Sequence, residues 1–193
     1  MTEINQNKDK EEQDKVQKQI ILKLVLLGDA GVGKTSLVNM YTEYHFKEDY
    51  KPTLGVNIVV KEIEIEKIDA KIRLILWDIA GQNRYDLSRK MYFGGALGAL
   101  FIYDTTRNST FQNIEAKWLK DVKEFSEGEP AYILIGNKID LEDSKVISME
   151  AGKKLAEKIN ASDFVETSAK YGDNVEIAFK KLVDKVLTNR GVK

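Results

Sequence analysis

The sequence predicts an α/β fold with a mostly parallel six-stranded sheet, one antiparallel edge strand, and helices on both faces. From residue 20 onward, apolar runs of strand length alternate with amphipathic helical patterns, which is typical of a parallel sheet whose strands are connected by helices. Two of the runs are apolar at every position, as expected for strands covered on both faces. Another pair is joined by so short a turn that its strands must be antiparallel.

The first half of the chain predicts a strand, a helix and a hairpin. Residues 20–27 form an apolar run that leads through a glycine-rich loop into a helical pattern from Ser36. Residues 62–66 alternate with a period of two, which predicts a strand with one solvated face. A turn at residues 69–70 leads to the partner strand of a hairpin. One face of that strand carries Ile72, Leu74 and Leu76.

The second half predicts three strands and further helices. Residues 96–103 and 131–135 are apolar throughout, and residues 164–165 predict a short last strand. Asp173 and Glu176 match the spacing of a capping box and predict the start of the final helix. An earlier helix is indicated by an apolar stripe, whose tryptophan we interpret as a core residue. The stripe consists of Phe111, Ile114, Trp118, Val122 and Phe125.

The composition indicates one globular domain with short charged ends. The chain has 193 residues, of which 42% are hydrophobic and 32% charged, and its net charge is −1. A charge so close to zero gives no electrostatic support for nucleic-acid binding. We expect residues 1–19 to form a flexible charged tail, residues 20–188 to form the domain, and residues 189–193 to form a short C-terminal tail.

Nothing in the sequence predicts a direct attachment to membranes. There is no run of about 18 apolar residues and no apolar signal-peptide segment at the N-terminus. Cysteine is absent, which leaves no site for prenyl or palmitoyl groups, and Thr2 stands where N-myristoylation needs glycine. We therefore expect a cytoplasmic protein without a direct lipid anchor on this chain, recruited to membranes only through protein partners.

Residues 28–35 carry the most informative motif. They read Gly-Asp-Ala-Gly-Val-Gly-Lys-Thr and match G-x-x-x-x-G-K-[ST] at every fixed position. Such a loop between a strand and a helix points backbone N–H groups at phosphates. Its lysine reaches the β- and γ-phosphates, and its threonine hydroxyl binds Mg²⁺. The candidate nucleotide-binding residues here are Asp29, Ala30, Gly31, Val32, Gly33, Lys34, Thr35 and Ser36.

A second motif follows the second strand of the hairpin. Asp78 ends the apolar segment 74–77 and precedes Gly81 and Gln82. A carboxylate at this place can hold Mg²⁺ through its water. Gly81 lets a backbone N–H approach a γ-phosphate, and Gln82 can orient a water for attack on phosphorus. The spacing of Asp78 and Gly81 alone is weak evidence for a nucleotide site, but it is stronger evidence when it follows a phosphate-binding loop in the same chain.

A third and a fourth motif follow the last two predicted strands and indicate guanine as the base. Asp140 can accept paired hydrogen bonds from guanine N1–H and N2–H₂, which adenine cannot donate. The aliphatic stem of Lys138 can cover the base, and Asn137 can tie loops together. In the fourth motif the N–H of Ala169 can meet guanine O6. The candidate base-binding residues are Asn137, Lys138, Asp140, Ser168, Ala169 and Lys170.

Together these motifs resemble those of the Ras superfamily of small GTPases, from about residue 20 to residue 187. The resemblance implies a P-loop NTPase fold with a three-layer G domain, GTP and GDP as substrate and ligand, and Mg²⁺ as cofactor, held by Thr35, Thr53 and Asp78. It extends to residues 45–53, which resemble the switch I segment. There it implies that Phe46 packs against the base, Tyr50 covers the phosphates, and Thr53 binds Mg²⁺ and the γ-phosphate.

Within the superfamily the chain looks most like the Rab branch, on residues 77–85 and 53–58. This implies a GTPase-activating protein, an exchange factor and effectors as partners, with effectors reading an exposed trio of Ile58, Trp77 and Tyr92. The chain departs from the Rab pattern in having an aliphatic residue at Ile58, Asn83 after the glutamine, and no cysteine pair after residue 190.

Three functions are compatible with these motifs. The first is a GTP/GDP switch with slow, Mg²⁺-dependent hydrolysis that regulates membrane trafficking or signalling, in which Gln82, Lys34 and Thr53 are the catalytic residues. The second is a guanine-nucleotide-binding scaffold with negligible turnover, which the intact catalytic set disfavours. The third is an ATP-using P-loop kinase, against which Asp140 argues.

Overall fold

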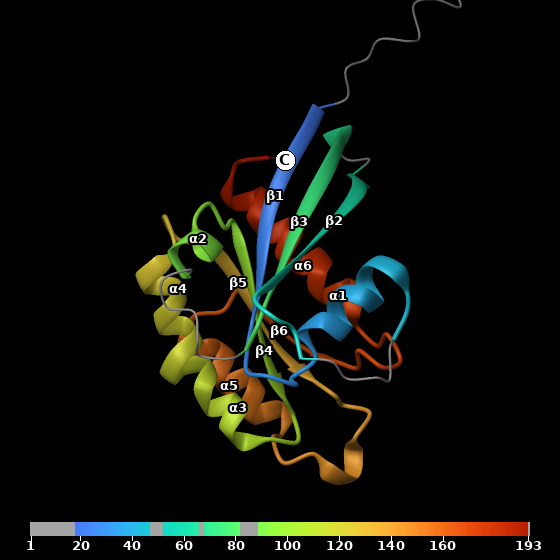
Figure 1. Cartoon of the computed structure of the whole chain (residues 1–193), viewed down its shortest axis with the longest axis vertical. Helices are drawn as coiled ribbons and strands as arrows, with labels where there is room; N and C mark the ends of the chain where they lie inside the picture. The colour runs from blue at the N-terminus through green and yellow to red at the C-terminus, as the bar shows by residue number, and fades with distance from the viewer. Residues whose placement is uncertain (1–17, 47–51, 66–67, 82–88, 193) are drawn as a thin grey trace, which may run out of the picture.

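The computed structural model describes residues 18–46, 52–65, 68–81 and 89–192. Within them, six strands form one sheet in the order β2-β3-β1-β4-β5-β6 (Figure 1). Only β2 and β3 pair in antiparallel fashion, and every other neighbouring pair is parallel. The predicted fold class is confirmed. The strands are β1 (Lys18–Leu27), β2 (Val56–Ile65), β3 (Ala70–Ile79), β4 (Gly98–Asp104), β5 (Ala131–Asn137) and β6 (Asp163–Thr167).

Helices cover both faces of the sheet, as the alternation of patterns predicts. In Figure 1, α1 and α6 lie on one side of the sheet, and α2, α3, α4 and α5 lie on the other. Each side has its own buried core. Along β1, Leu24 and Leu26 belong to the first core, whereas Val25 and Leu27 belong to the second. A strand buried on both faces explains why residues 20–27 are almost continuously apolar.

The helices predicted from Ser36, along the apolar stripe and near the C-terminus are present, with two differences. A π-helical turn, η3 (Ile114–Trp118), interrupts the helix that carries the apolar stripe. The final helix begins at Val175, and no side chain caps it, so the predicted capping box is wrong. The helices are α1 (Lys34–Glu43), α2 (Arg89–Phe93), α3 (Asn108–Asn113), α4 (Leu119–Phe125), η4 (Glu142–Ser144), α5 (Met149–Ile159) and α6 (Val175–Asn189).

The tail boundary also differs from the expectation. Lys18 and Gln19, expected in the N-terminal tail, are the first residues of β1 and pair with the start of β3. Within the described ranges, no helix combines the length and the apolar composition that a membrane span requires.

The carboxyl ends of the parallel strands meet at one edge of the sheet. There Asp104 of β4 lies opposite Asn137 of β5, which lies opposite Thr167 of β6. On the other side of β4, β1 ends at Leu27 and leads into the glycine-rich loop. In open α/β sheets, ligands bind beyond this edge.

Candidate functional site

A cavity of about 970 Å³ lies at this edge and collects most of the predicted site residues. Asp29, Val32, Asp78 and Ser168 are not part of its lining. Tyr50 and Gln82 lie outside the described residues. The predicted residues in the lining are Ala30, Gly31, Gly33, Lys34, Thr35, Ser36, Phe46, Thr53, Gly81, Asn137, Lys138, Asp140, Ala169 and Lys170.

Two close approaches at the site permit only glycine. One is at Gly33 in the glycine-rich loop, and the other is at Gly81, just after β3. Gly33 has a φ of 102°, and a Cβ there would lie 2.3 Å from the Asn137 amide nitrogen. At Gly81 a Cβ would lie 2.2 Å from the backbone nitrogen of Ala30. The segment after β3 therefore packs backbone to backbone against the loop, as a shared phosphate site requires.

Lys34 is enclosed by the loop from which it projects. Its Nζ donates to the carbonyl oxygens of Gly28 at 2.7 Å and Asp29 at 2.9 Å. Burial lowers the pKa of Lys34 to about 8, although the charges of Asp78 and Asp29 oppose the shift. A buried ammonium at the first turn of a helix forms a cationic site suited to phosphate.

Two hydroxyls and a carboxylate converge beside the loop. The Thr35 and Thr53 hydroxyl oxygens are 2.8 Å apart, and Thr35 donates to Oδ2 of Asp78. Asp78 is fully buried, and its Oδ1 has no hydrogen-bond partner among the described residues. Burial raises the pKa of Asp78, against the hydrogen bond from Thr35 and the charge of Lys34.

This group fits Mg²⁺ better than a metal bound wholly by protein. The described residues contain no cluster of three or more His, Cys, Asp or Glu side chains that could hold a metal. Mg²⁺ binds few carboxylates and takes its remaining oxygen ligands from water and phosphate. Thr35, Thr53 and Asp78 offer such a partial set of oxygen ligands, and the unpartnered Oδ1 suits a metal-bound water.

Asn137 joins three loops, as predicted. Its Nδ2 donates to the Val32 carbonyl at 2.8 Å, and its Oδ1 accepts from the Thr167 hydroxyl at 3.0 Å and the Ala169 N–H at 3.1 Å. The Ala169 N–H is thus already a donor within the protein. Its expected contact with guanine O6 stays a prediction and requires a shared hydrogen bond.

Asp140 is held in place by the fourth motif. The Ser168 hydroxyl donates to Oδ1 of Asp140 at 2.7 Å and accepts from the Tyr171 N–H at 3.2 Å. Ser168 is buried, so it orients Asp140 from behind the cavity. An oriented carboxylate that lines the cavity suits recognition of two adjacent N–H donors.

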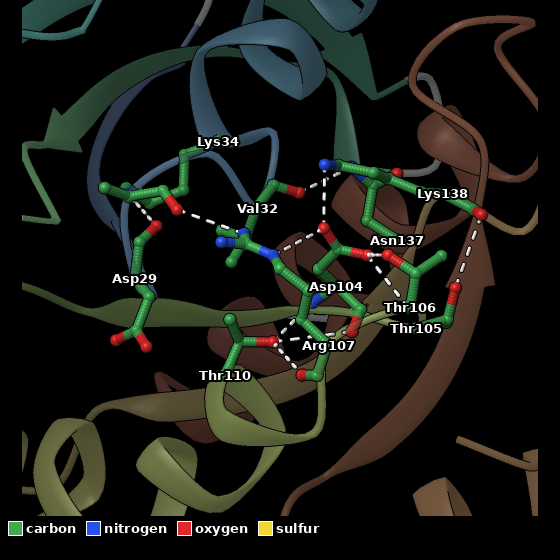
Figure 2. A network of polar contacts seen from close by, with 11 residues as sticks. Asp29, Val32, Lys34, Asp104, Thr105, Thr106, Arg107, Thr110, Asn137 and Lys138 are labelled. Carbon is green, nitrogen blue, oxygen red and sulfur yellow. Dashed lines mark hydrogen bonds and ion pairs between the residues drawn. The ribbon is translucent and has the colours of Figure 1, made fainter. Parts of the chain in front are cut away.

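The lining also contains residues that were not predicted as site residues, among them Asp104 and Arg107. Asp104 is buried and binds both Lys138 and Arg107, as Figure 2 shows. Arg107 lines the cavity and donates to the Ala30 carbonyl at 3.0 Å. The place of Asp104 in the sequence could have identified it as a site residue, because it directly follows the apolar run 96–103 at the carboxyl end of a buried strand.

The phosphate loop is also attached to the helix across the second core. Asp29 accepts from Nε1 of Trp118 at 2.9 Å and from Nδ2 of Asn113 at 2.7 Å. Trp118 is buried, as predicted, and it also fixes the side chain of Asp29. It lies in η3, and π-helical turns occur often near functional sites.

The predicted effector trio forms a contiguous cluster of unequal exposure. Ile58 lies opposite Trp77 across the hairpin, and the rings of Trp77 and Tyr92 are 6.3 Å apart. Ile58 is 46% exposed, whereas Tyr92 is only 7% exposed. The expectation of an exposed apolar trio is therefore wrong for Tyr92, which packs beneath Trp77 in the second core.

Asp104→Asn should lower the free energy of unfolding by about 1.5–3 kcal/mol at neutral pH, since hydrogen bonds to a charged group are lost. Burial alone raises the pKa of Asp104, but hydrogen bonds from Lys138 and Thr106 outweigh it and hold the pKa below its usual value. A lowered native pKa contributes stability above the unfolded pKa of about 4, and this stability is lost as pH falls through the native value.

Urea unfolding at pH 7, 5 and 3.5 measures this effect. The difference in the free energy of unfolding between wild type and variant should stay constant down to pH 5 and then shrink. A difference that shrinks between pH 7 and 5 would contradict the lowered pKa.

Comparison with known proteins agrees with the geometry. The family model described as "Ras family" matches residues 23–188. Ras-related protein RABA6b of Arabidopsis thaliana is 42% identical over 166 residues, which is 86% of this chain and 71% of that protein. Ras-related protein RABA5e of Arabidopsis thaliana is 38% identical over 176 residues, 91% of this chain and 79% of that protein. Ras-related protein RGP2 of Oryza sativa subsp. japonica is 38% identical over 166 residues, 86% of this chain and 75% of that protein.

The match covers the phosphate loop, the segment after β3 that contains Gly81, and both candidate base-binding loops, which together line the cavity. The chain therefore belongs to the Ras superfamily of small GTPases, as a Rab-like GTP-binding member.

Proposed function

We propose that this chain is a GTP/GDP switch that hydrolyses GTP slowly with Mg²⁺ and acts through effectors in membrane trafficking or signalling. The observation that carries the proposal is the joining of the phosphate loop and Asp140 in one cavity. A phosphate loop alone serves many nucleotides, whereas a fixed carboxylate at the base end selects guanine over adenine.

Hydrolysis of this kind depends on positioning and on neutralising charge. Lys34 supplies a fixed cation at the phosphates, and Thr35, Thr53 and Asp78 would hold Mg²⁺. When bound, Mg²⁺ supplies further neutralisation of phosphate charge. Gln82 is proposed to orient the attacking water, and Tyr50 to cover the phosphates. Phe46 lines the cavity and is proposed to pack against the base.

The proposal is tested by nucleotide binding and single-turnover hydrolysis on the purified chain. GDP and GTP should bind tightly in Mg²⁺, release faster when Mg²⁺ is chelated, and resist displacement by ATP. Single-turnover conversion of GTP to GDP separates a switch from a scaffold with negligible turnover. Displacement of GDP by ATP at comparable concentration would contradict guanine selectivity and favour the kinase alternative.

The switch should appear as a difference in hydrogen exchange between two segments and the rest of the chain. We expect residues 46–58 and 81–92 to exchange more slowly with a non-hydrolysable GTP analogue than with GDP, because Thr53 and Gly81 would contact the γ-phosphate. Residues 47–51 and 82–88 of these segments lie outside the described residues. Exchange in β5 serves as the internal control, and equal protection of both segments in both states would rule out the switch.

The partners are proposed on the same basis. Ile58 and Trp77 pair across the hairpin, and the buried Tyr92 packs against Trp77, so we expect a change in either segment to alter the surface that Ile58 and Trp77 present. A GTPase-activating protein and an exchange factor are expected from family membership. Recruitment to membranes is proposed to occur through protein partners.

A further inference from the structure

We propose that Asp104 is a positioning residue that couples the guanine-reading loop (residues 137–140) to the phosphate loop (residues 28–35) by holding Lys138 and Arg107 together. The inference rests on the proposed guanine-nucleotide function and deepens it. Asp104 itself also lines the cavity, but in this proposal it contacts neither a base nor a phosphate. It acts through the two cations that line the cavity.

The position of Asp104 and the hydrogen bonds to both of its carboxylate oxygens fit such a coupling. It is the last residue of β4 and is only 1% exposed. Its Oδ2 accepts from Nζ of Lys138 at 2.7 Å and from Nε of Arg107 at 2.9 Å. Its Oδ1 accepts from the N–H of Thr106 at 2.9 Å and from the Thr106 hydroxyl at 2.7 Å. Both oxygens are occupied, so the carboxylate has one well-defined orientation.

The first cation, Lys138, belongs to the guanine-reading loop. Lys138 has a φ of 72°, a left-handed conformation that is uncommon for a residue with a side chain. Its ammonium is held by Asp104, and its carbonyl accepts from the Thr105 hydroxyl at 3.3 Å. Lys138 stands between Asn137, which binds the phosphate loop, and Asp140. The contact with Asp104 therefore stabilises the backbone that presents Asp140 to the base.

The second cation holds the phosphate loop. Nη2 of Arg107 donates to the Ala30 carbonyl at 3.0 Å, while Nε of the same guanidinium donates to Asp104. The peptide bond is planar and trans, so fixing the Ala30 carbonyl also fixes the opposite direction of the Gly31 N–H. Gly31 lines the cavity. Arg107 thus maintains the orientation of a phosphate-facing N–H, and Figure 2 shows the path from Lys138 through Asp104 to this loop.

The geometry requires an arginine rather than any cation. Asp104 and the Ala30 carbonyl are bound by different nitrogens of one rigid, planar group. The ammonium of lysine is a single point charge on a flexible stem and cannot span both acceptors in the same way. Replacement of Arg107 by lysine should therefore resemble replacement by alanine.

The test is the dissociation rate of fluorescently labelled GDP in Mg²⁺. We expect release to accelerate about 10- to 100-fold in Asp104→Asn and about 3- to 10-fold in Arg107→Ala and Arg107→Lys, because loss of buried charge pairs is seen mainly in the dissociation rate. The double variant Asp104→Asn/Arg107→Ala should release GDP no faster than Asp104→Asn alone. Such non-additivity identifies residues that act as one unit. Asp184→Asn, an exposed change on α6, is the matched control and should release GDP at the wild-type rate.

A second readout separates coupling from general loosening of the base site. IDP lacks the 2-amino group that Asp140 is proposed to read. Because Arg107 also holds the phosphate loop, which both nucleotides share, Asp104→Asn should accelerate the release of IDP as well as that of GDP, whereas Asp140→Asn should act mainly on GDP. Far-UV circular dichroism shows whether each variant is folded. If Asp104→Asn does not fold, the two Arg107 variants, whose side chain is partly exposed, carry the test.

The outcomes are distinguishable. Failure of the wild type to bind GDP would overturn the proposed function. Tight GDP binding by the wild type, with unchanged release from Asp104→Asn or from both Arg107 variants, would overturn only the coupling. Strictly additive effects in the double variant would also overturn it, because Asp104 and Arg107 would then act separately.

Discussion

Asp140→Asn should lower the affinity for GDP and GTP by roughly 10⁴-fold, the discrimination typical of a site built to hydrogen-bond a polar group of its ligand. The wild-type carboxylate offers two acceptors to guanine N1–H and N2–H₂. In the variant, an amide N–H₂ would face the guanine amino group, so two donors would oppose each other without a partner.

The same variant should gain xanthosine diphosphate as a ligand. Xanthine carries an oxygen where guanine carries the 2-amino group, and the new amide can donate to it. The amide oxygen is retained as an acceptor for the base and for the Ser168 hydroxyl, which binds Asp140 at 2.7 Å. The gain makes the test specific, since a merely destabilised protein would lose both ligands.

Competition titrations with GDP, xanthosine diphosphate and ATP provide the measurement. Asp143→Asn, an exposed change three residues further on in η4, is the matched control and should keep the preference for GDP. A variant at Asp140 that still prefers GDP over xanthosine diphosphate would remove this residue from base recognition.

A partner that inserts an arginine should accelerate GTP hydrolysis by roughly 10³- to 10⁵-fold, and hydrolysis without it should be slow. Arg107 is the arginine among the described residues that line the cavity. Its Nε and Nη2 are bound to Asp104 and to the Ala30 carbonyl. It is therefore engaged in holding the loop, and we expect it not to stabilise charge on the γ-phosphate.

Single-turnover hydrolysis with and without a Rab-directed GTPase-activating domain measures this effect. The same domain with its inserted arginine replaced by alanine is the control and should give little acceleration. Gln82→Leu should bind GTP normally but hydrolyse it more slowly in both conditions, because the attacking water loses its orienting group. Equal rates for Gln82→Leu and wild type would exclude Gln82 from the mechanism, and fast hydrolysis without a partner would contradict the need for an inserted arginine.

The motifs at the site could be predicted because each is a short run of residues with a local geometry. Residues 28–35 form one loop between β1 and α1, and their spacing alone predicts where Lys34 and Thr35 lie. The positions of Asp78 and Asn137 at the ends of β3 and β5 follow from apolar runs that stop at polar residues. Parallel strands bring those ends to one edge, so the cavity follows from the order of elements.

Local patterns gave wrong answers where tertiary contacts decide. Asp173 and Glu176 have capping-box spacing, yet the Asp173 carbonyl accepts from the Ser168 N–H at 3.1 Å and the helix begins at Val175. Tyr92 looked exposed from its place in a family pattern, but it packs in the second core. In the first case the adjoining loop binds the Asp173 backbone, and in the second Trp77 of β3 packs against Tyr92.

The sequence by itself determined the fold class and the phosphate loop, and it indicated the candidate base-reading residues, since these depend on hydrophobic periodicity and on spacing within one loop. Only the tertiary structure decided that Asp104 holds Lys138 and Arg107, and that Trp118 fixes Asp29. An apolar stripe predicts that a tryptophan is buried but not where its N–H donates. Likewise, a charge at the end of a strand predicts a site but not its partners. Those partners lie up to 89 residues away along the chain and become neighbours only when the sheet and its helices pack.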